Sequence, residues 1–155
     1  MMLASDIGTA RSLALQDLIA IALFWFRRRR RQAVLAALSL SGAIVLSSAL
    51  KIAFPRARPA PYFNLAVPPS SSFPSGHALE SFCLYATLAW LFATVSGPFP
   101  ARLAAWIAAL AILFIGFSRL YLGLHYPTDV VAGYAAGAVW TALLAIFQTK
   151  LYTCG

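Results

Sequence analysis

Acidic side chains are scarce in this sequence. Only four of its 155 residues are Asp or Glu, and charged residues of both signs together make up 10%. A soluble domain of ordinary composition carries about 25% charged residues, so this chain has too little charge to cover a water-facing surface. Hydrophobic residues make up 61%. The composition predicts an integral membrane protein with one domain, residues 1–155.

Cysteine is also scarce. The two cysteines, Cys83 and Cys154, do not form the kind of disulfide framework that staples a small secreted domain. Nor do Cys, His and carboxylate residues occur together at the spacing of a metal site. We therefore expect no metal and no other cofactor.

Basic residues outnumber acidic ones and give a formal net charge of +8. Five of the twelve form a single run, Arg27 to Arg31. In a soluble protein such a run is typical of a nucleic-acid patch. Because apolar segments flank it here, it favours a cytoplasmic topology anchor under the positive-inside rule. We expect membrane lipids, and no nucleic acid, as partners.

Long uncharged runs separate the other charged residues. A membrane span needs about 20 mainly apolar residues, and the pattern predicts an all-α integral membrane helix bundle of about five transmembrane helices. Four have full-length runs, at residues 32–52, 76–96, 103–122 and 127–148. The first candidate, residues 12–26, is shorter and contains Asp17. A tilted or truncated span and an interfacial helix both remain open for it.

The arginine run also sets the predicted orientation. If it faces the cytoplasm, the chain crosses outward, returns, turns at residues 97–102 on the inner side and crosses twice more. Polar residues from separate parts of the sequence then meet at the outer face: Lys51, Arg58, His77, Arg119, His125 and Asp129. The brevity of the chain favours a bacterial cytoplasmic membrane, with this face outside.

The stretch "PSGH", residues 74–77, opens one of the predicted spans. Ser75 and Gly76 would occupy its N-cap region, where backbone N–H groups and the helix dipole attract anions. Glycine allows close backbone approach, and His77 would point at the bound anion. This segment predicts an anion site.

Three cations join this predicted site: Lys51, Arg58 and Arg119. Uncompensated charge in a membrane costs about 2.5–3.5 kcal/mol per group on insertion scales. Asp129 and Glu80 cannot neutralise all three cations. A ligand with more than one negative charge would, and the arginine fork suits phosphate oxygens.

His125 and Asp129 lie four residues apart across Pro127, which fits the first turn of a helix. A carboxylate there would fix the tautomer of His125 and leave its other ring nitrogen nucleophilic. His77 would protonate the leaving oxygen. The residues alone thus predict phosphoryl transfer through a phosphohistidine.

These residues fall into three short motifs: Lys51-x6-Arg58-Pro59, Pro74-Ser75-Gly76-His77 and Ser118-Arg119-x5-His125-x3-Asp129. Together they resemble the three signature motifs of the type 2 phosphatidic acid phosphatase (PAP2) superfamily, which includes membrane lipid phosphatases and related haloperoxidases. Bacterial members commonly have six transmembrane helices, whereas at most five are visible here.

The resemblance implies a role for each matching residue. His125 would attack phosphorus, Asp129 would orient it and His77 would act as general acid. Lys51, Arg58, Ser75, Gly76 and Arg119 would hold the phosphoryl oxygens, without a metal. Arg56 lies outside the motif spacing, so we expect it to be solvated or to face lipid headgroups.

We therefore expect a membrane lipid phosphatase. Its candidate substrates are undecaprenyl diphosphate, phosphatidylglycerol phosphate and phosphatidic acid. A lipid phosphotransferase would use the same residues, with a lipid hydroxyl replacing water. A non-catalytic lipid-phosphate-binding protein is the alternative from another class, although such proteins usually lack the nucleophile or the acid. The sequence does not indicate an oligomeric state.

Overall fold

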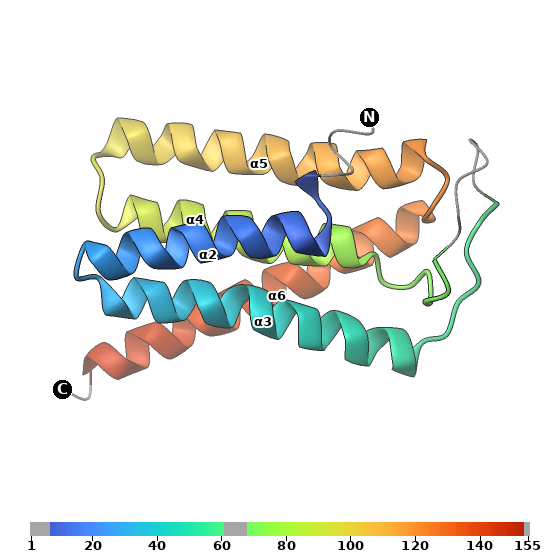
Figure 1. Cartoon of the computed structure of the whole chain (residues 1–155), viewed down its shortest axis with the longest axis horizontal. Coiled ribbons are helices and arrows are strands. Elements are labelled where there is room, and N and C mark those ends of the chain that lie inside the picture. Colours follow the sequence, from blue (N-terminus) through green and yellow to red (C-terminus); the bar gives the residue numbers. More distant parts are fainter. Residues whose placement is uncertain (1–6, 61–67, 154–155) are drawn as a thin grey trace.

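The computed structural model describes residues 7–60 and 68–153, and in these ranges every regular element is a helix. The five long helices are α2 (Ala10–Phe26), α3 (Arg30–Ala53), α4 (Gly76–Ala93), α5 (Pro98–Tyr121) and α6 (Pro127–Thr153), arranged as a bundle (Figure 1). The all-α prediction is confirmed.

The start of α5 differs from the sequence prediction. Residues 97–102 were expected to form a turn, but the helix already begins at Pro98, after Gly97 as an extended N-cap residue. Proline suits the first helical position because its fixed φ is already helical and its missing N–H would have no partner there. The prolines in this segment therefore begin a helix instead of breaking one.

Helix α4 lies at the centre of the bundle and packs against each of the other four long helices. Its buried side chains include Leu79, Leu84 and Leu91, each with no exposed surface. On the α6 side, Gly137 permits a close approach, because a Cβ there would lie only 3.0 Å from the Cβ of Phe82. This central position fixes the start of α4 relative to its neighbours.

Three helices have the length and composition of membrane spans: α3, α5 and residues Pro127–Thr149 of α6, with mean hydropathy 2.1, 2.0 and 1.9. The two others are shorter, α4 with 18 residues and α2 with 17. Helix α4 carries His77 and Glu80 and needs less apolar surface because its neighbours cover it. Large apolar side chains such as Trp106, 70% exposed, face outward from the bundle. The protein is thus an integral membrane helix bundle.

The two ends of the bundle differ in their polar residues. The run Arg27 to Arg31 covers the connection between α2 and α3 and the start of α3 at one end, at the left in Figure 1. The end of α3, the start of α4 and the α5–α6 connection meet at the other end, where the long loop before α4 also lies (Figure 1). The predicted site residues therefore gather at the second end.

Candidate active site

The turn after α5 places His125. Gly123 adopts a positive φ of 66° just past the helix end, and the N–H of Leu124 donates to the carbonyl of Arg119 over 3.1 Å. Glycine takes this left-handed conformation without the steric cost of a side chain. The chain thus reverses within a few residues and brings His125, 6% exposed, to the start of α6.

Asp129 lies in the first turn of α6, where its carboxylate folds back to the helix start. Its Oδ2 accepts the backbone N–H of Tyr126 over 2.9 Å, as the acidic residue of a capping box does. The side chain is fully buried. A carboxylate also suits the positive end of the helix dipole. Local helix capping therefore holds this carboxylate beside His125.

Ser72 connects the two side chains. Its hydroxyl donates to Asp129 Oδ2 over 2.5 Å and lies 3.4 Å from His125 Nδ1. The direct distance from His125 Nδ1 to Asp129 Oδ2 is 3.6 Å, which is too long for a good hydrogen bond. The serine thus bridges the pair that the sequence predicted to be in direct contact.

The other ring nitrogen of His125 faces Arg58. Nη1 of Arg58 lies 3.1 Å from His125 Nε2 and also donates to the carbonyl of Leu124 over 3.0 Å. Because a guanidinium can only donate, Nε2 must be the unprotonated nitrogen. The ring proton is then on Nδ1, toward Ser72 and Asp129.

Arg56 was expected to be solvated or to face headgroups; it is exposed, but it also contacts Asp129, which the expectation did not include. Its Nη1 lies 2.7 Å from Asp129 Oδ1 and 2.8 Å from the hydroxyl of Thr128. Its guanidinium also lies over the ring of Tyr126, 4.2 Å from the centroid. Arg56 therefore pairs with Asp129 Oδ1, the carboxylate oxygen that Ser72 does not contact. The side chain of Arg56 is nevertheless 41% exposed.

Two other cations are held by backbone carbonyls. Lys51 donates to the carbonyls of Ser71 and Pro74 over 3.1 and 2.8 Å. Arg58 donates through Nε to the carbonyl of Ser70 over 3.0 Å. Neither makes a salt bridge within the part of the chain that the structure describes. The ammonium of Lys51 and the guanidinium of Arg58 therefore have hydrogen-bond acceptors, but neither is paired with a carboxylate in this part of the chain.

His77, in the first turn of α4, faces Arg119 near the end of α5. Nη1 of Arg119 lies 3.2 Å from His77 Nε2, so this nitrogen also accepts and is unprotonated in this state. Arg119 is buried, with 4% of its surface exposed. His77 lies within electrostatic reach of His125, Arg58 and Lys51. The two histidines therefore belong to one site.

Ser75 is the N-cap residue of α4, but its side chain makes no capping hydrogen bond. Its fully buried Oγ has no hydrogen-bond partner among the described residues. Its backbone N–H donates to the carbonyl of Asp129 over 3.0 Å, which joins the starts of α4 and α6. The unpaired hydroxyl and the free N–H groups of a helix start are what an anion would bind.

Gly76 has a second reason to be glycine besides the one inferred from the sequence. A Cβ at this position would lie 3.1 Å from Ser47 Oγ and 3.2 Å from Glu80 Oε1. The missing side chain therefore makes room for two polar neighbours. Glu80 lies on the same side of α4, near Lys51.

The surroundings of His125 also set its charge. Burial, with further contributions from the positive charges of Arg58 and Lys51, lowers its pKa from 6.5 to about 4. Asp129 and the hydrogen bond with Ser72 act in the opposite direction but do not outweigh them. His125 is therefore neutral at pH 7, as a nitrogen nucleophile must be.

All eight predicted site residues lie at this end of the bundle: Lys51, Arg58, Ser75, Gly76, His77, Arg119, His125 and Asp129. The sequence reasoning missed Ser72 and the contact of Arg56 with Asp129. Ser72 and Arg56 both lie in the long loop, which has no helical periodicity to indicate direction. No cluster of three potential metal ligands occurs in residues 7–60 and 68–153.

Comparison with known proteins gives consistent matches. The family model described as PAP2 superfamily matches residues 32–152. Phosphatidylglycerophosphatase B of Bacillus subtilis is 32% identical over 130 residues, covering 82% of this chain and 63% of that protein. An undecaprenyl-diphosphatase of Sulfolobus acidocaldarius is 30% identical over 129 residues, covering 78% of this chain and 57% of that protein.

A solved structure matches closely as well. The crystal structure of a transmembrane PAP2-type phosphatidylglycerolphosphate phosphatase from Bacillus subtilis superposes with a TM-score of 0.87 at 29% identity. The match covers 96% of this chain and 75% of that one. The chain thus spans 57% to 63% of the length of the two sequence relatives and three quarters of the solved chain.

Proposed function

Because this chain belongs to the PAP2 superfamily, whose model matches residues 32–152, we propose that it is a metal-independent membrane phosphatase. It hydrolyses a lipid phosphate or diphosphate in two steps through a phosphohistidine at His125. The observation that carries the proposal is the arrangement of His125. One nitrogen is backed by Ser72 and Asp129, and the other is a lone-pair acceptor facing Arg58.

In the first step, His125 Nε2 attacks phosphorus and the bond from phosphorus to the leaving oxygen breaks. His77 donates a proton to that oxygen. The positive charge that develops on the His125 ring is stabilised by Asp129 through the Nδ1 side. In the second step, water gives its proton to His77 and attacks phosphorus, and the P–N bond breaks to release inorganic phosphate and neutral His125.

His77 needs a proton for the first step, although its Nε2 accepts from Arg119 in this state. Binding of a phosphoryl group changes the protonation state of His77 for two reasons. Its oxygens compete with His77 for the guanidinium of Arg119, and its negative charge favours a protonated imidazole nearby. Substrate binding thus prepares the acid.

The phosphoryl oxygens bind where the site has unused positive potential. Lys51 and Arg58 make no salt bridge with a carboxylate among the described residues, and Arg119 lies beside His77. Ser75 Oγ and the start of α4 supply neutral donors. These donors also stabilise the extra negative charge of the transition state. Asp129 is paired with Arg56 and makes no salt bridge with Lys51 or Arg58.

A lipid substrate fits the position of the site. The catalytic end of the bundle adjoins an apolar exterior, and a cavity of about 810 Å³ lies between the end of α3 and the loop, beside Lys51 and Arg58. Such a cavity offers a headgroup room while its chains stay in the membrane. The relatives' names differ in the lipid that they specify, so both a monophosphate and a diphosphate belong in the test.

The proposed setting is the bacterial cytoplasmic membrane, with the site at the outer face. The support is the arginine run at the opposite end of the bundle, which the positive-inside rule assigns to the cytoplasm. Labelling of a cysteine placed at Ala57 by a membrane-impermeant thiol reagent in intact cells would test it. Labelling only after lysis would reverse the orientation.

The decisive experiment measures phosphate release by the purified protein from phosphatidylglycerol phosphate, undecaprenyl diphosphate and phosphatidic acid, with His125→Ala alongside. We expect release from at least one lipid, its loss in the variant, and no effect of EDTA. Release that survives in His125→Ala would contradict the mechanism. Phosphate transferred to an added acceptor lipid, without free phosphate, would identify a phosphotransferase.

A further inference from the structure

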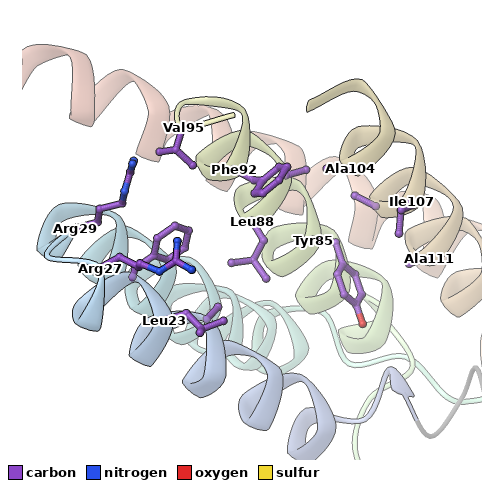
Figure 2. Close-up of a pocket in the computed structure, with 14 residues that line it drawn as sticks. Leu23, Arg27, Arg29, Tyr85, Leu88, Phe92, Val95, Ala104, Ile107 and Ala111 are labelled. Atoms are coloured by element: carbon purple, nitrogen blue, oxygen red, sulfur yellow. The ribbon is translucent and has the colours of Figure 1, made fainter. Parts of the chain in front are cut away.

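Helices α2 and α5 both pack on α4 but do not contact each other within the described residues. Between them lies a cavity of about 590 Å³, with α4 as its floor (Figure 2). Figure 2 shows Leu23 of α2 on one side, Leu88 and Phe92 of α4 in the middle and Ile107 of α5 on the other side. The volume is within the range of about 300–1,000 Å³ that is typical of small-molecule sites.

The groove is closed toward the active site. Tyr85 donates a hydrogen bond to Gln16 over 2.8 Å and so joins α4 to α2. Beyond it, Gly8 packs so tightly that a Cβ there would lie 2.6 Å from Ile115 and 3.2 Å from His77. The groove is therefore separate from the phosphate site.

The length of the groove indicates what can fill it. On α4 its lining runs from Tyr85 to Phe92, which corresponds to about 10 Å at 1.5 Å per residue, and Val95 lies just past the end of the helix. The hydrocarbon core of a bilayer is about 30 Å thick, so the groove lies within one leaflet and is shorter than it. Part of an acyl chain can occupy this depth, whereas a transmembrane helix would have to continue past the closed end.

The open end of the groove carries positive charge. Arg27 and Arg29 line it on the side of α2, opposite Val95 (Figure 2). Both arginines are exposed, and none of the salt bridges in the described part of the chain involves them. An apolar groove that lies within one leaflet and ends at two arginines has the chemistry to bind an anionic lipid.

We propose that this groove holds an acyl chain of an anionic glycerophospholipid from the leaflet opposite the active site, with the headgroup phosphate on Arg27 and Arg29. The lipid fills the space between α2 and α5 and joins two helices that otherwise meet only through α4. It is a structural ligand and not a substrate, and the proposal is independent of the proposed catalytic function.

The test is native mass spectrometry of the detergent-solubilised full chain with phosphatidylglycerol and with phosphatidylcholine of the same acyl chains. We expect phosphatidylglycerol to bind more tightly and to raise the melting temperature more. Each arginine near a headgroup contributes roughly a fivefold gain in affinity, so R27Q/R29Q should bind phosphatidylglycerol at least about tenfold more weakly. The matched control R28Q/R102Q removes the same charge from the same end but leaves the groove lining intact, and should retain binding.

A second variant tests the groove itself and does not alter the charge anchor. Ala104→Phe places a ring in the cavity from α5, and we expect it to displace the lipid and to remove the lipid-dependent rise in melting temperature. Equal binding of both lipids, or unchanged binding in both R27Q/R29Q and Ala104→Phe, would overturn the proposal. A dimer that Ala104→Phe converts to a monomer would overturn it in favour of a second copy of the chain.

Discussion

The two histidines of the site have the same side chain but contrasting surroundings. His125 is buried and backed by Ser72 and Asp129, with Arg58 on its free nitrogen. His77 is half-buried at the start of α4, and its Nε2 lies 3.2 Å from a cation, Nη1 of Arg119. A carboxylate therefore supports positive charge on the ring of His125, whereas the ring of His77 makes no salt bridge with a carboxylate among the described residues.

This difference accounts for the two roles proposed for the histidines of one site, a nucleophile and an acid. A ring that must become positively charged when phosphorus is attached benefits from a carboxylate behind it. A ring that must release its proton to a leaving oxygen benefits from neighbouring positive charge, which makes the protonated form a stronger acid. The surroundings favour His125 as the nucleophile and His77 as the acid.

The largest expected effect comes from removing the support of His125. Asp129→Asn retains the shape of the side chain but removes its negative charge. The variant therefore loses the ion pair with Arg56 and the electrostatic support of His125 Nδ1. We expect kcat to fall by about 10³–10⁴-fold in the lipid phosphatase assay. Asp17→Asn, a carboxylate of α2 remote from the site, is the control and should remain active. A tenth or more of wild-type activity in Asp129→Asn would contradict the orienting role.

The acid role of His77 predicts a dependence on the leaving group. With a lipid phosphate, whose alkoxide is a poor leaving group, His77→Ala should reduce kcat by about 10²–10⁴-fold. With p-nitrophenyl phosphate, whose leaving group needs no proton, the loss should be much smaller. The measurement is the ratio of the two losses. Equal losses on both substrates would show that His77 binds the phosphoryl group and does not protonate the leaving oxygen.

Arg56 should have a smaller effect, because its pair with Asp129 is partly exposed to solvent. Loss of about 1 kcal/mol from such a pair corresponds to roughly a fivefold lower kcat in Arg56→Gln, with little change in KM. Removing its positive charge should also raise the pKa of His125 and move the acid limb of kcat/KM upward. Arg56→Lys should restore part of the rate, and Arg102→Gln is the charge-matched control. An unchanged acid limb would leave Arg56 with a structural role only.

The smallest expected effect is the response of the wild-type protein to mild acid. The pKa of His125 is lowered to about 4, so its neutral, nucleophilic form persists from pH 7 to about pH 5 and is lost as the pH approaches 4. We therefore expect that protonation of His125 causes no decrease in kcat/KM between pH 7 and about pH 5. The measurement is the pH profile of kcat/KM, corrected for the ionisation of the substrate. A decrease in the corrected kcat/KM with a midpoint near pH 6.5 would mean that the surroundings do not lower the pKa of His125.

Much of this site could be predicted from the sequence because the helices alternate in direction. Apolar runs identify the spans, and each reversal returns a polar segment to the same end, so Lys51, His77 and His125 converge. The sequence also indicates where α4 and α6 begin. Ser75 and Gly76 precede the apolar run of α4, and Pro127 and Asp129 are typical of the first turn of a helix.

The loop before α4 could not be predicted in the same way. Ser72 and Arg56 reach Asp129 through contacts between residues 57 and 73 positions apart in the sequence. No local pattern encodes such a contact, since a proline-rich segment has neither the helical nor the strand period. Arg56 lies two residues from a motif arginine, and spacing alone does not distinguish which arginine faces the carboxylate.

The central position of α4 also has a consequence for how the protein is made. This helix carries His77 and Glu80 and is shorter than α3, α5 and α6, so it gains less from lipid alone than they do. Its stable position depends on α5 and α6, which leave the ribosome after it. We therefore expect the helix that begins the proposed anion site to be fully secured in the bilayer only when the later helices have been synthesised, so that the proposed catalytic pocket forms last.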